Sequence, residues 1–346
     1  MNKPTLHDVA RAAGVSYATA DRVVNARGGV ADKSILRVQQ AIESLGYERD
    51  IFAANLSRKR VYRFLFVLPK GDHSFFSALR QAVDSEAVLR RADRVTIQVI
   101  EVPALDSDAL AEVLEDEDLT CDCMAVVAAE TPRISAAISG MRARGIAVVT
   151  LVGDTCSEWR SAYVGIDNIV AGAMAGRLLR VAHRQQTGLI LPVLGSPKAR
   201  DHRERLQGML GVLAEETPLA VLPALQVDDR PELMRARVAE AMVQPITGIY
   251  SIGAGNRGLI EVLQGLPGPR PFVVMHELTP TSRGGLERGL VDAVIDQKPA
   301  QEVALAIDVM KAIADGRVWS DPARQITPTI YLKDNLPDTG GQGDMT

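Results

Sequence analysis

The stretch from Thr5 to Asn25, TLHDVARAAGVSYATADRVVN, predicts two short helices joined by a tight turn. Thr5 and Asp8 have the spacing of a capping box, in which each side chain satisfies a free backbone N–H at the start of a helix. Gly14 supplies the backbone freedom for the turn, and Ser16 is a suitable N-cap for the second helix. Residues at helical spacing mark the inner faces: Leu6, Val9, Ala10 and Ala13, then Thr19, Ala20, Val23 and Val24.

The outer face of the second helix carries a cluster of side chains near its N-terminus. Tyr17, Ala18, Asp21 and Arg22 lie away from the inner face. A tight turn followed by an exposed helix is the helix-turn-helix arrangement, whose recognition helix enters the major groove of DNA. Arg22 offers a bidentate fork to guanine, and Ala18 offers an apolar contact to a thymine methyl group. The stretch therefore predicts a DNA-binding headpiece.

These residues resemble the headpiece of the LacI/GalR-type bacterial transcription factors, which open with T-L-x-D-V-A-x-x-A-G-V-S. The match covers residues 5–60 and continues through RVVN, LGY and AANL. It departs from the family at Ala20-Asp21, where Val-Ser is usual; an acid at this place would repel phosphates. The resemblance implies that the following residues contact DNA: Thr5, Ser16, Tyr17, Ala18, Thr19, Arg22, Asn25, Ala53 and Leu56.

A third helix from about Asp32 to Leu45 completes the predicted head, residues 1–49. Residues 50–61 form a connector, which the resemblance identifies as a hinge helix that orders on DNA and pairs with its mate in a homodimer. Leu56 takes the place of a wedge in the minor groove. Such a wedge unstacks a base step and bends the duplex.

Charge divides the chain into two parts. The 346 residues have a net charge of −4, yet residues 1–63 hold 11 Lys and Arg against 6 Asp and Glu. The remaining residues hold 28 Lys and Arg against 37 Asp and Glu, so a head of +5 precedes a body of −9. This separation favours phosphate contact at one end only.

From residue 62 onward, apolar strand-like runs alternate with amphipathic stretches, which predicts parallel sheets covered on both faces by helices. About ten strands are more than one lobe needs, so we expect two doubly wound lobes over residues 62–335, followed by a flexible tail, 336–346. The expected strands are 62–68, 95–101, 123–129, 146–152, 188–194, 219–226, 248–252, 271–275 and 291–295. The expected helices are 75–91, 106–117, 131–144, 168–183, 201–216, 230–243, 256–264, 280–288 and 300–314.

Polar and aromatic side chains follow several of the predicted strands, where ligands bind in such sheets. Carboxylates accept from sugar hydroxyls, Arg donates in a fork, and aromatic rings cover the apolar face of a sugar. The body resembles the fold of the type I periplasmic sugar-binding proteins, which this regulator family shares. The resemblance places these residues at or near the effector: His73, Phe75, Phe76, Glu130, Arg203, Asn256 and Glu277.

Two other interpretations remain open. Gly253-Ala-Gly-Asn-Arg-Gly258 is a literal G-x-G-x-x-G between a strand and a helix, which alone would suggest an NAD(P)-dependent oxidoreductase. That fingerprint normally opens a nucleotide domain on its first strand, whereas this copy comes late in the chain. The other alternative is a sugar-binding module that has no DNA function.

The remaining features favour a regulator over an enzyme. Five His residues without metal spacing and no G-x-S-x-G elbow give no catalytic constellation, and we expect no metal and no cofactor. Three cysteines, Cys121, Cys123 and Cys156, are too few for a disulfide framework, and no apolar run could span a bilayer. We therefore expect a cytoplasmic, homodimeric, ligand-responsive repressor of carbohydrate or polyol genes, bound to a near-palindromic operator.

Overall fold

The computed structural model describes residues 4–24, 28–47, 60–70, 74–155, 158–184, 186–214, 218–253, 255–317, 319 and 326–338. The chain forms two compact units, Met1–Arg60 and Val61–Thr346. In the following, the first unit is called the head and the second unit the body.

The described part of the head contains the helices α1 (Leu6–Ala13), α2 (Tyr17–Val24) and α3 (Asp32–Leu45). The capping box is present: the Asp8 carboxylate accepts from the Thr5 N–H at 2.9 Å, and the Asp8 N–H donates to the Thr5 hydroxyl. Gly14 ends α1 with φ +61°, as the turn requires. Small and branched side chains form the core of the head: Val9, Ala10, Ala13, Ala20, Val38 and Ala41.

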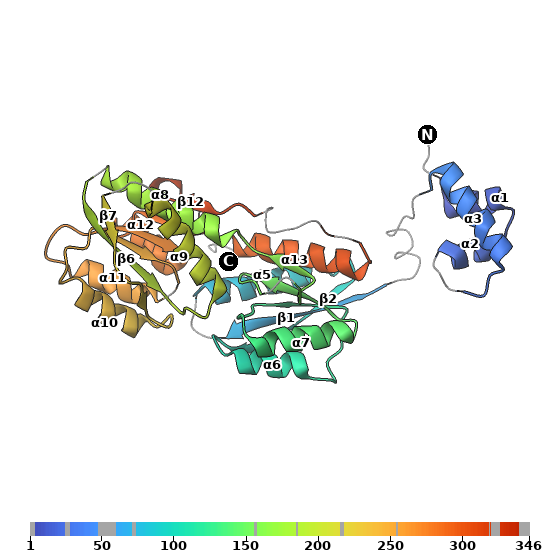
Figure 1. Ribbon diagram of the computed structural model, residues 1–346, viewed down its shortest axis with the longest axis horizontal. Helices are drawn as coiled ribbons and strands as arrows, with labels where there is room; N and C mark the ends of the chain where they lie inside the picture. Colours follow the sequence, from blue (N-terminus) through green and yellow to red (C-terminus); the bar gives the residue numbers. More distant parts are fainter. Residues whose placement is uncertain are drawn as a thin grey trace, which may run out of the picture. The chain divides into compact units, whose positions relative to one another are not determined.

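The first lobe of the body is built on a five-stranded parallel sheet in the order β2-β1-β3-β4-β5 (Figure 1). Its strands are β1 (Tyr62–Lys70), β2 (Val95–Pro103), β3 (Cys123–Val126), β4 (Ala147–Leu151) and β5 (Ala162–Val164). Its helices are α5 (Ser74–Leu89), α6 (Ser107–Glu115), α7 (Pro132–Ala143) and α13 (Pro299–Ala314). Phe64 in β1 stands opposite Ile97 in β2 and Cys123 in β3, which fixes the register at the centre of the sheet.

The second lobe contains the sheet β12-β11-β10-β9-β6-β7, with β8 beside β6. Its strands are β6 (Gly188–Leu194), β7 (Leu219–Val221), β8 (Leu225–Gln226), β9 (Gly248–Ser251), β10 (Phe272–His276), β11 (Ala293–Asp296) and β12 (Thr329–Tyr331). Its helices are α8 (Asn168–His183), α9 (Arg200–Leu213), α10 (Pro231–Ala241), α11 (Asn256–Gln264) and α12 (Pro280–Glu287). The strands pair in parallel, except that β12 runs antiparallel to β11.

Each sheet is buried on both faces. In the first lobe, α5 and α13 cover one face and α6 and α7 the other (Figure 1). In the second lobe, α8 and α9 cover one face and α10, α11 and α12 the other. The prediction of a helical head and a body of two doubly wound α/β lobes is confirmed.

The structure differs from the predicted elements at four places. The short strands β5 and β12 were not predicted, and the run 219–226 is broken into β7 and β8. Strands of two or three residues carry too little periodicity to be recognised without their neighbours. At the end of the chain, Leu336 packs on the second lobe and the Pro337 carbonyl accepts from Arg283 at 2.8 Å, so these two residues belong to the lobe and not to a free tail.

Glycines allow α8 and α9 to pack at unusually short range. A Cβ atom at Gly172 would overlap the backbone of Arg205, and one at Gly208 would overlap the backbone carbonyl of Ile169. The two helices therefore cross with their backbones in contact. This crossing sets which face of α9 points toward the space between the lobes.

Candidate functional site

The second helix of the head presents an exposed polar surface. Ser16 begins α2: its hydroxyl accepts from the Thr19 N–H at 3.1 Å and lies 2.8 Å from the Thr19 hydroxyl. Tyr17, Ala18 and Arg22 are exposed, as expected of base-reading positions. Capping fixes the first turn of α2, so these side chains are held on a rigid element.

Two further contacts order the same surface. The ring of Tyr17 lies 4.4 Å from that of His7 between centroids, which ties α2 to α1. Thr5 is exposed at the start of α1 and is held by Asp8. The other three predicted DNA contacts, Asn25, Ala53 and Leu56, lie outside the described residues, as does most of the predicted hinge.

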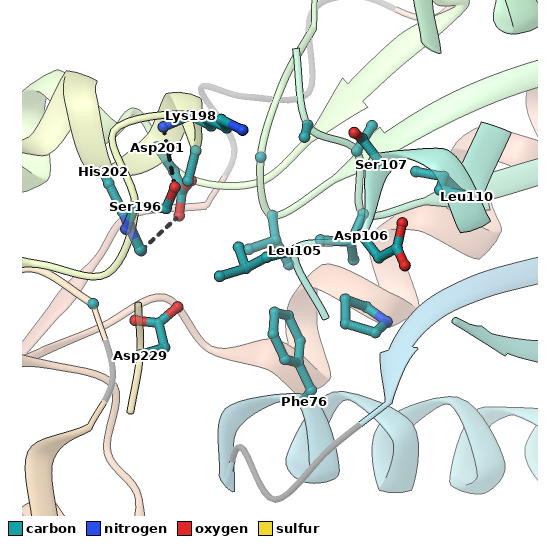
Figure 2. Close-up of a pocket in the computed structure, with 18 of the residues that line it drawn as sticks. Phe76, Leu105, Asp106, Ser107, Leu110, Ser196, Lys198, Asp201, His202 and Asp229 are labelled. Carbon is teal, nitrogen blue, oxygen red and sulfur yellow. Dashed lines mark hydrogen bonds and ion pairs between the residues drawn. The ribbon is translucent and has the colours of Figure 1, made fainter. Parts of the chain in front are cut away.

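A cleft opens between the two lobes of the body, beyond the carboxyl ends of the strands. It consists of two adjoining cavities of about 150 and 450 Å3, which share Phe75, Phe76, Leu105, Asp229, Gly253 and Glu277. Figure 2 shows Asp201, His202 and Asp229 of the second lobe across the same space from Phe76 and Leu105 of the first. This is where ligands bind in open α/β sheets.

Strained backbone is concentrated around this cleft. Five non-glycine residues of its lining have left-handed φ values: Leu105 at 61°, Val152 at 67°, Asp228 at 48°, Asp229 at 56° and Glu277 at 66°. Such conformations cost free energy and cluster at ligand sites, where the surrounding structure holds them. Their concentration supports a binding role for the cleft.

Arg205 is the buried cation at the base of the cleft. Its Nε donates to the Asn168 side chain at 2.8 Å, and its Nη atoms donate to the Ile252 carbonyl at 3.2 Å and the Gln297 side chain at 3.4 Å. Burial disfavours its charge, but Asp201 and Glu277 outweigh burial and raise the pKa of Arg205. The guanidinium is therefore oriented almost entirely by the protein.

Glu277 follows β10 and lines both cavities. Its Oε1 accepts from the Gln297 amide at 2.8 Å and lies 3.6 Å from an Nη of Arg205. Its Oε2 is buried without a hydrogen-bond partner among the described residues. Burial raises the pKa of the Glu277 carboxyl to about 8, although Arg205 opposes the rise.

Two more buried titratable groups lie behind Glu277. His276 Nε2 is 2.7 Å from the Tyr250 hydroxyl, and burial lowers the pKa of this imidazole well below its usual value. Glu302 on α13 is fully buried, and burial raises the pKa of its carboxyl well above the usual range. Burial therefore favours the neutral form of both groups.

The structure brings together some of the residues expected at the effector site. Phe75, Phe76, Asn256 and Glu277 line the cleft. Glu130 and Arg203 are absent from its described lining, because Arg203 Nη2 lies 2.7 Å from Glu130 Oε2 and the pair joins the lobes outside the cavities. His73 lies outside the described residues.

Sequence reasoning missed Arg205, Asp201, Asp229 and Gln297, all of which line the cleft. A signal for Arg205 was present. Arg205 stands on the helical stripe of His202, Met209 and Val212, which are buried. An arginine on a buried stripe needs acceptors within the fold, and this marks it as a functional candidate.

The glycines of the G-x-G-x-x-G run serve packing. A Cβ at Gly258 would overlap the Pro231 carbonyl of the neighbouring helix, so this glycine lets α10 and α11 meet. A Cβ at Gly253 would come within 2.6 Å of the Asp229 carboxylate. Because the Asp229 carboxylate lies next to Gly253, it would repel a pyrophosphate bound there, which argues against dinucleotide binding by this run.

The described ranges contain no metal-binding cluster and no membrane-spanning helix. No group of His, Cys, Asp or Glu side chains there could hold a metal ion, and Cys121 and Cys123 are free thiols. No helix in those ranges is long and apolar enough to cross a bilayer.

Two protein families match the chain. Residues 64–317 match the family described as periplasmic binding protein domain, and residues 5–50 match the bacterial regulatory proteins of the lacI family. The chain is 33% identical over 98 residues to the HTH-type transcriptional regulator DegA of Bacillus subtilis, 28% of each protein. It is 26% identical over 216 residues to the regulator MalR of Streptomyces coelicolor, 62% of this chain and 60% of that one. The chain thus aligns with less than two thirds of the length of either relative.

Solved structures show the same fold in the body. A solute-binding protein of Burkholderia graminis in complex with D-arabinose has a TM-score of 0.73 at 21% identity, covering 79% of this chain and 96% of that one. A solute-binding protein of Bacillus halodurans with bound myo-inositol has a TM-score of 0.71 at 16% identity, covering 80% and 96%.

Proposed function

We infer the function from one premise: the chain belongs to the periplasmic binding protein domain family and carries a lacI-family regulatory domain at its N-terminus. We propose that it is a sequence-specific DNA-binding transcriptional regulator, a repressor of carbohydrate or polyol utilisation genes, whose affinity for DNA depends on a small effector. It binds its effector and does not convert it.

The observation that carries this proposal is the combination of two sites in one chain. The exposed face of α2 presents Tyr17, Ala18 and Arg22 from a capped, rigid helix. The body presents an interlobe cleft lined by aromatic and hydrogen-bonding side chains. A head that reads DNA and a cleft that binds a small molecule are what a ligand-responsive regulator requires.

The DNA partner is proposed to be a near-palindromic operator bound by a homodimer. Two copies of α2 would read half-sites about 10 base pairs, or one helical turn, apart. Leu56 of the connector would enter the minor groove between them, with the small Ala53 where the two connectors approach each other. Thr5, Ser16, Thr19 and Asn25 would hold the head on the DNA backbone.

The effector is proposed to be a sugar or polyol. Phe75 and Phe76, whose ring centroids are 5.4 Å apart, offer an apolar surface for a sugar face. Asn256 and Glu277 offer an amide and a carboxyl group for hydroxyls. Closure of the lobes on this ligand would change the spacing of the two connectors and shift DNA affinity by a coupling free energy of about 1–3 kcal/mol.

The test uses the full-length protein. Selection from a random duplex library followed by footprinting should yield a two-fold symmetric site, and thermal-shift measurements against sugars, polyols and NAD(P) should identify a stabilising ligand. That ligand should then change the dissociation constant for the selected site. Recovery of no preferred sequence would refute the regulator proposal, and stabilisation by NAD(P) alone would refute the sugar effector.

A further inference from the structure

The cleft carries more negative than positive side chains. Apart from Glu277, whose carboxyl group has a pKa raised to about 8, its acidic lining residues are Asp106, Asp201, Asp228, Asp229 and Glu232, and its basic ones are Lys198, Arg205 and Arg257. A concave site lined by an excess of one charge raises the local concentration of ligands of the opposite charge. The balance therefore favours a cationic ligand over a neutral or anionic one.

Arg205 does not offset this excess for an incoming ligand. Its N–H groups donate to three acceptors of the protein, and its charge lies within 4.0 Å of both Glu277 and Asp201. An anionic ligand would therefore have to break contacts that the protein already makes. The guanidinium acts as a fixed part of the wall.

Two of the acids are also engaged by the protein. Asp106 caps α6 by accepting from the Asp108 and Ala109 N–H groups at 3.1 and 3.0 Å. Asp228 accepts from the Gln226 amide at 2.6 Å. Of the other acids in the lining, Asp201 and Glu277 lie beside Arg205 at the base of the cleft.

One carboxylate oxygen of Glu277, Oε2, is available to a ligand in the cleft. Its Oε1 is held by Gln297, whereas Oε2 is buried and makes no hydrogen bond to any described residue. Figure 2 shows the carboxylates of Asp201 and Asp229 at the edge of the cavity, which Glu277 also lines. A buried acceptor without a donor costs free energy, which a donor from a ligand would recover.

We propose that the effector is a sugar or polyol that bears an ammonium group, and that Glu277, with Asp201 and Asp229 nearby, selects this group over a hydroxyl. The inference rests on the proposed sugar or polyol effector and specifies its chemical class. The ammonium donates to Glu277 Oε2, while the ring lies against Phe75 and Phe76.

The charged neighbours of Glu277 predict a measurable signature of ammonium binding. It is faced by Arg205 and Asp201 of α9, His276 of β10, Asp296 of β11 and Glu302 of α13. In this setting the pKa of about 8 leaves Glu277 protonated at pH 7. An ammonium ion replaces that proton: the neutral carboxyl group and the cation become an ion pair, and one proton goes to the buffer.

The experiment compares ligands that differ in one group, using the full-length protein. D-glucosamine carries an amino group, D-glucose a hydroxyl group and N-acetyl-D-glucosamine an acetamido group at the same carbon, and galactose and mannose are tested in the same amino, hydroxyl and acetamido forms. Titration calorimetry at pH 7 in phosphate and in Tris measures affinity and proton release together. We expect an amino form to bind at least about tenfold more tightly than its hydroxyl and acetamido partners, since hydrogen bonds between charged groups are stronger than those between neutral groups. We also expect its binding enthalpy alone to depend on the buffer.

The variant Glu277→Gln keeps the shape of the side chain but cannot ionise, so the preference for the amine and the release of a proton on binding should both disappear. Asp229→Asn, at a half-buried position, is a second variant that should reduce the preference without touching the buried cluster. Glu115→Gln, on an exposed ion pair of the first lobe, is the control and should leave the preference intact.

The outcomes separate the two proposals. If a neutral sugar binds as tightly as its amino partner, the ammonium proposal fails and the sugar effector stands. If no amino form binds while the thermal-shift screen finds a neutral sugar or polyol, the ammonium proposal fails alone. If neither experiment finds a ligand, the ammonium proposal and the sugar or polyol effector both fail, while DNA binding by the head is unaffected.

Discussion

Arg203 on α9 lies 2.7 Å, through Nη2, from Oε2 of Glu130, which follows β3, so this ion pair joins the second lobe to the first. Arg200, three residues earlier, lies 3.8 Å from the same carboxylate and donates to the Thr155 carbonyl of the first lobe at 2.8 Å. Glu130 is therefore the centre of an interlobe contact that holds the cleft in the observed arrangement.

Replacing Glu130 by Gln should weaken this contact and favour a more open cleft. Exposed ion pairs contribute about 0.2–1 kcal/mol, so ligand affinity should fall by up to about fivefold, while the protein becomes less compact. Calorimetry and small-angle scattering measure these two effects. Glu115→Gln removes a pair of similar exposure with Arg133 inside one lobe and should change neither; equal effects of the two substitutions would contradict the interlobe role.

The crossing of α8 and α9 should not tolerate a larger residue at its glycines. Gly208→Ala places a Cβ against the Ile169 backbone, and we expect a loss of several kcal/mol in the free energy of unfolding, measured in urea. Gly211→Ala, on the same helix, meets nothing within 4 Å and should stabilise the protein by about 0.5–1 kcal/mol. Similar changes at both positions would show that the helices are not in close contact.

Glu277 should make the body less stable as pH rises. Its pKa of about 8 in the folded chain exceeds the 4.5 of a free glutamate, so the folded state retains a proton that the unfolded state releases. The contribution of Glu277 to the free energy of unfolding is fully present below about pH 4.5 and is lost as the pH rises to about 8. The free energy of unfolding falls by at most about 1.4 kcal/mol per pH unit over this range. Urea unfolding at several pH values should show that the difference in stability between the wild type and Glu277→Gln declines over this window. A constant difference would contradict the raised pKa.

Arg22 should determine sequence preference. Arg22→Ala should weaken binding to the selected operator by about 1–3 kcal/mol and change non-specific binding much less, as gel-shift titrations at one salt concentration would show. Arg11→Ala removes the same charge from α1 and is the matched control, expected to alter both kinds of binding alike. An equal loss of both for Arg22→Ala would assign this side chain to phosphate contact.

Leu56 should bend the operator. Leu56→Ala in the connector should reduce both the bend angle and the affinity, because the shorter side chain cannot unstack a base step. Circular-permutation gel shifts measure the bend. An unchanged angle would reject the wedge.

The sequence by itself determined the head and most elements of the body. The capping box, Gly14 and the Ser16 cap are contacts between residues three or four positions apart, so their pattern is readable without the fold. The helix Asp32–Leu45 was predicted with its observed bounds for the same reason. Alternating strands and amphipathic helices likewise fixed the two-lobed class.

Only the tertiary structure decided which side chains meet in the cleft. Arg203 and Arg205 are two residues apart and so lie on nearly opposite sides of α9. The packing of α8 against Gly208 turns Arg205 inward and leaves Arg203 to reach Glu130, 73 positions away in sequence. Sequence spacing shows that the two arginines point apart, but which of them faces the ligand depends on a contact between backbones far apart in the chain.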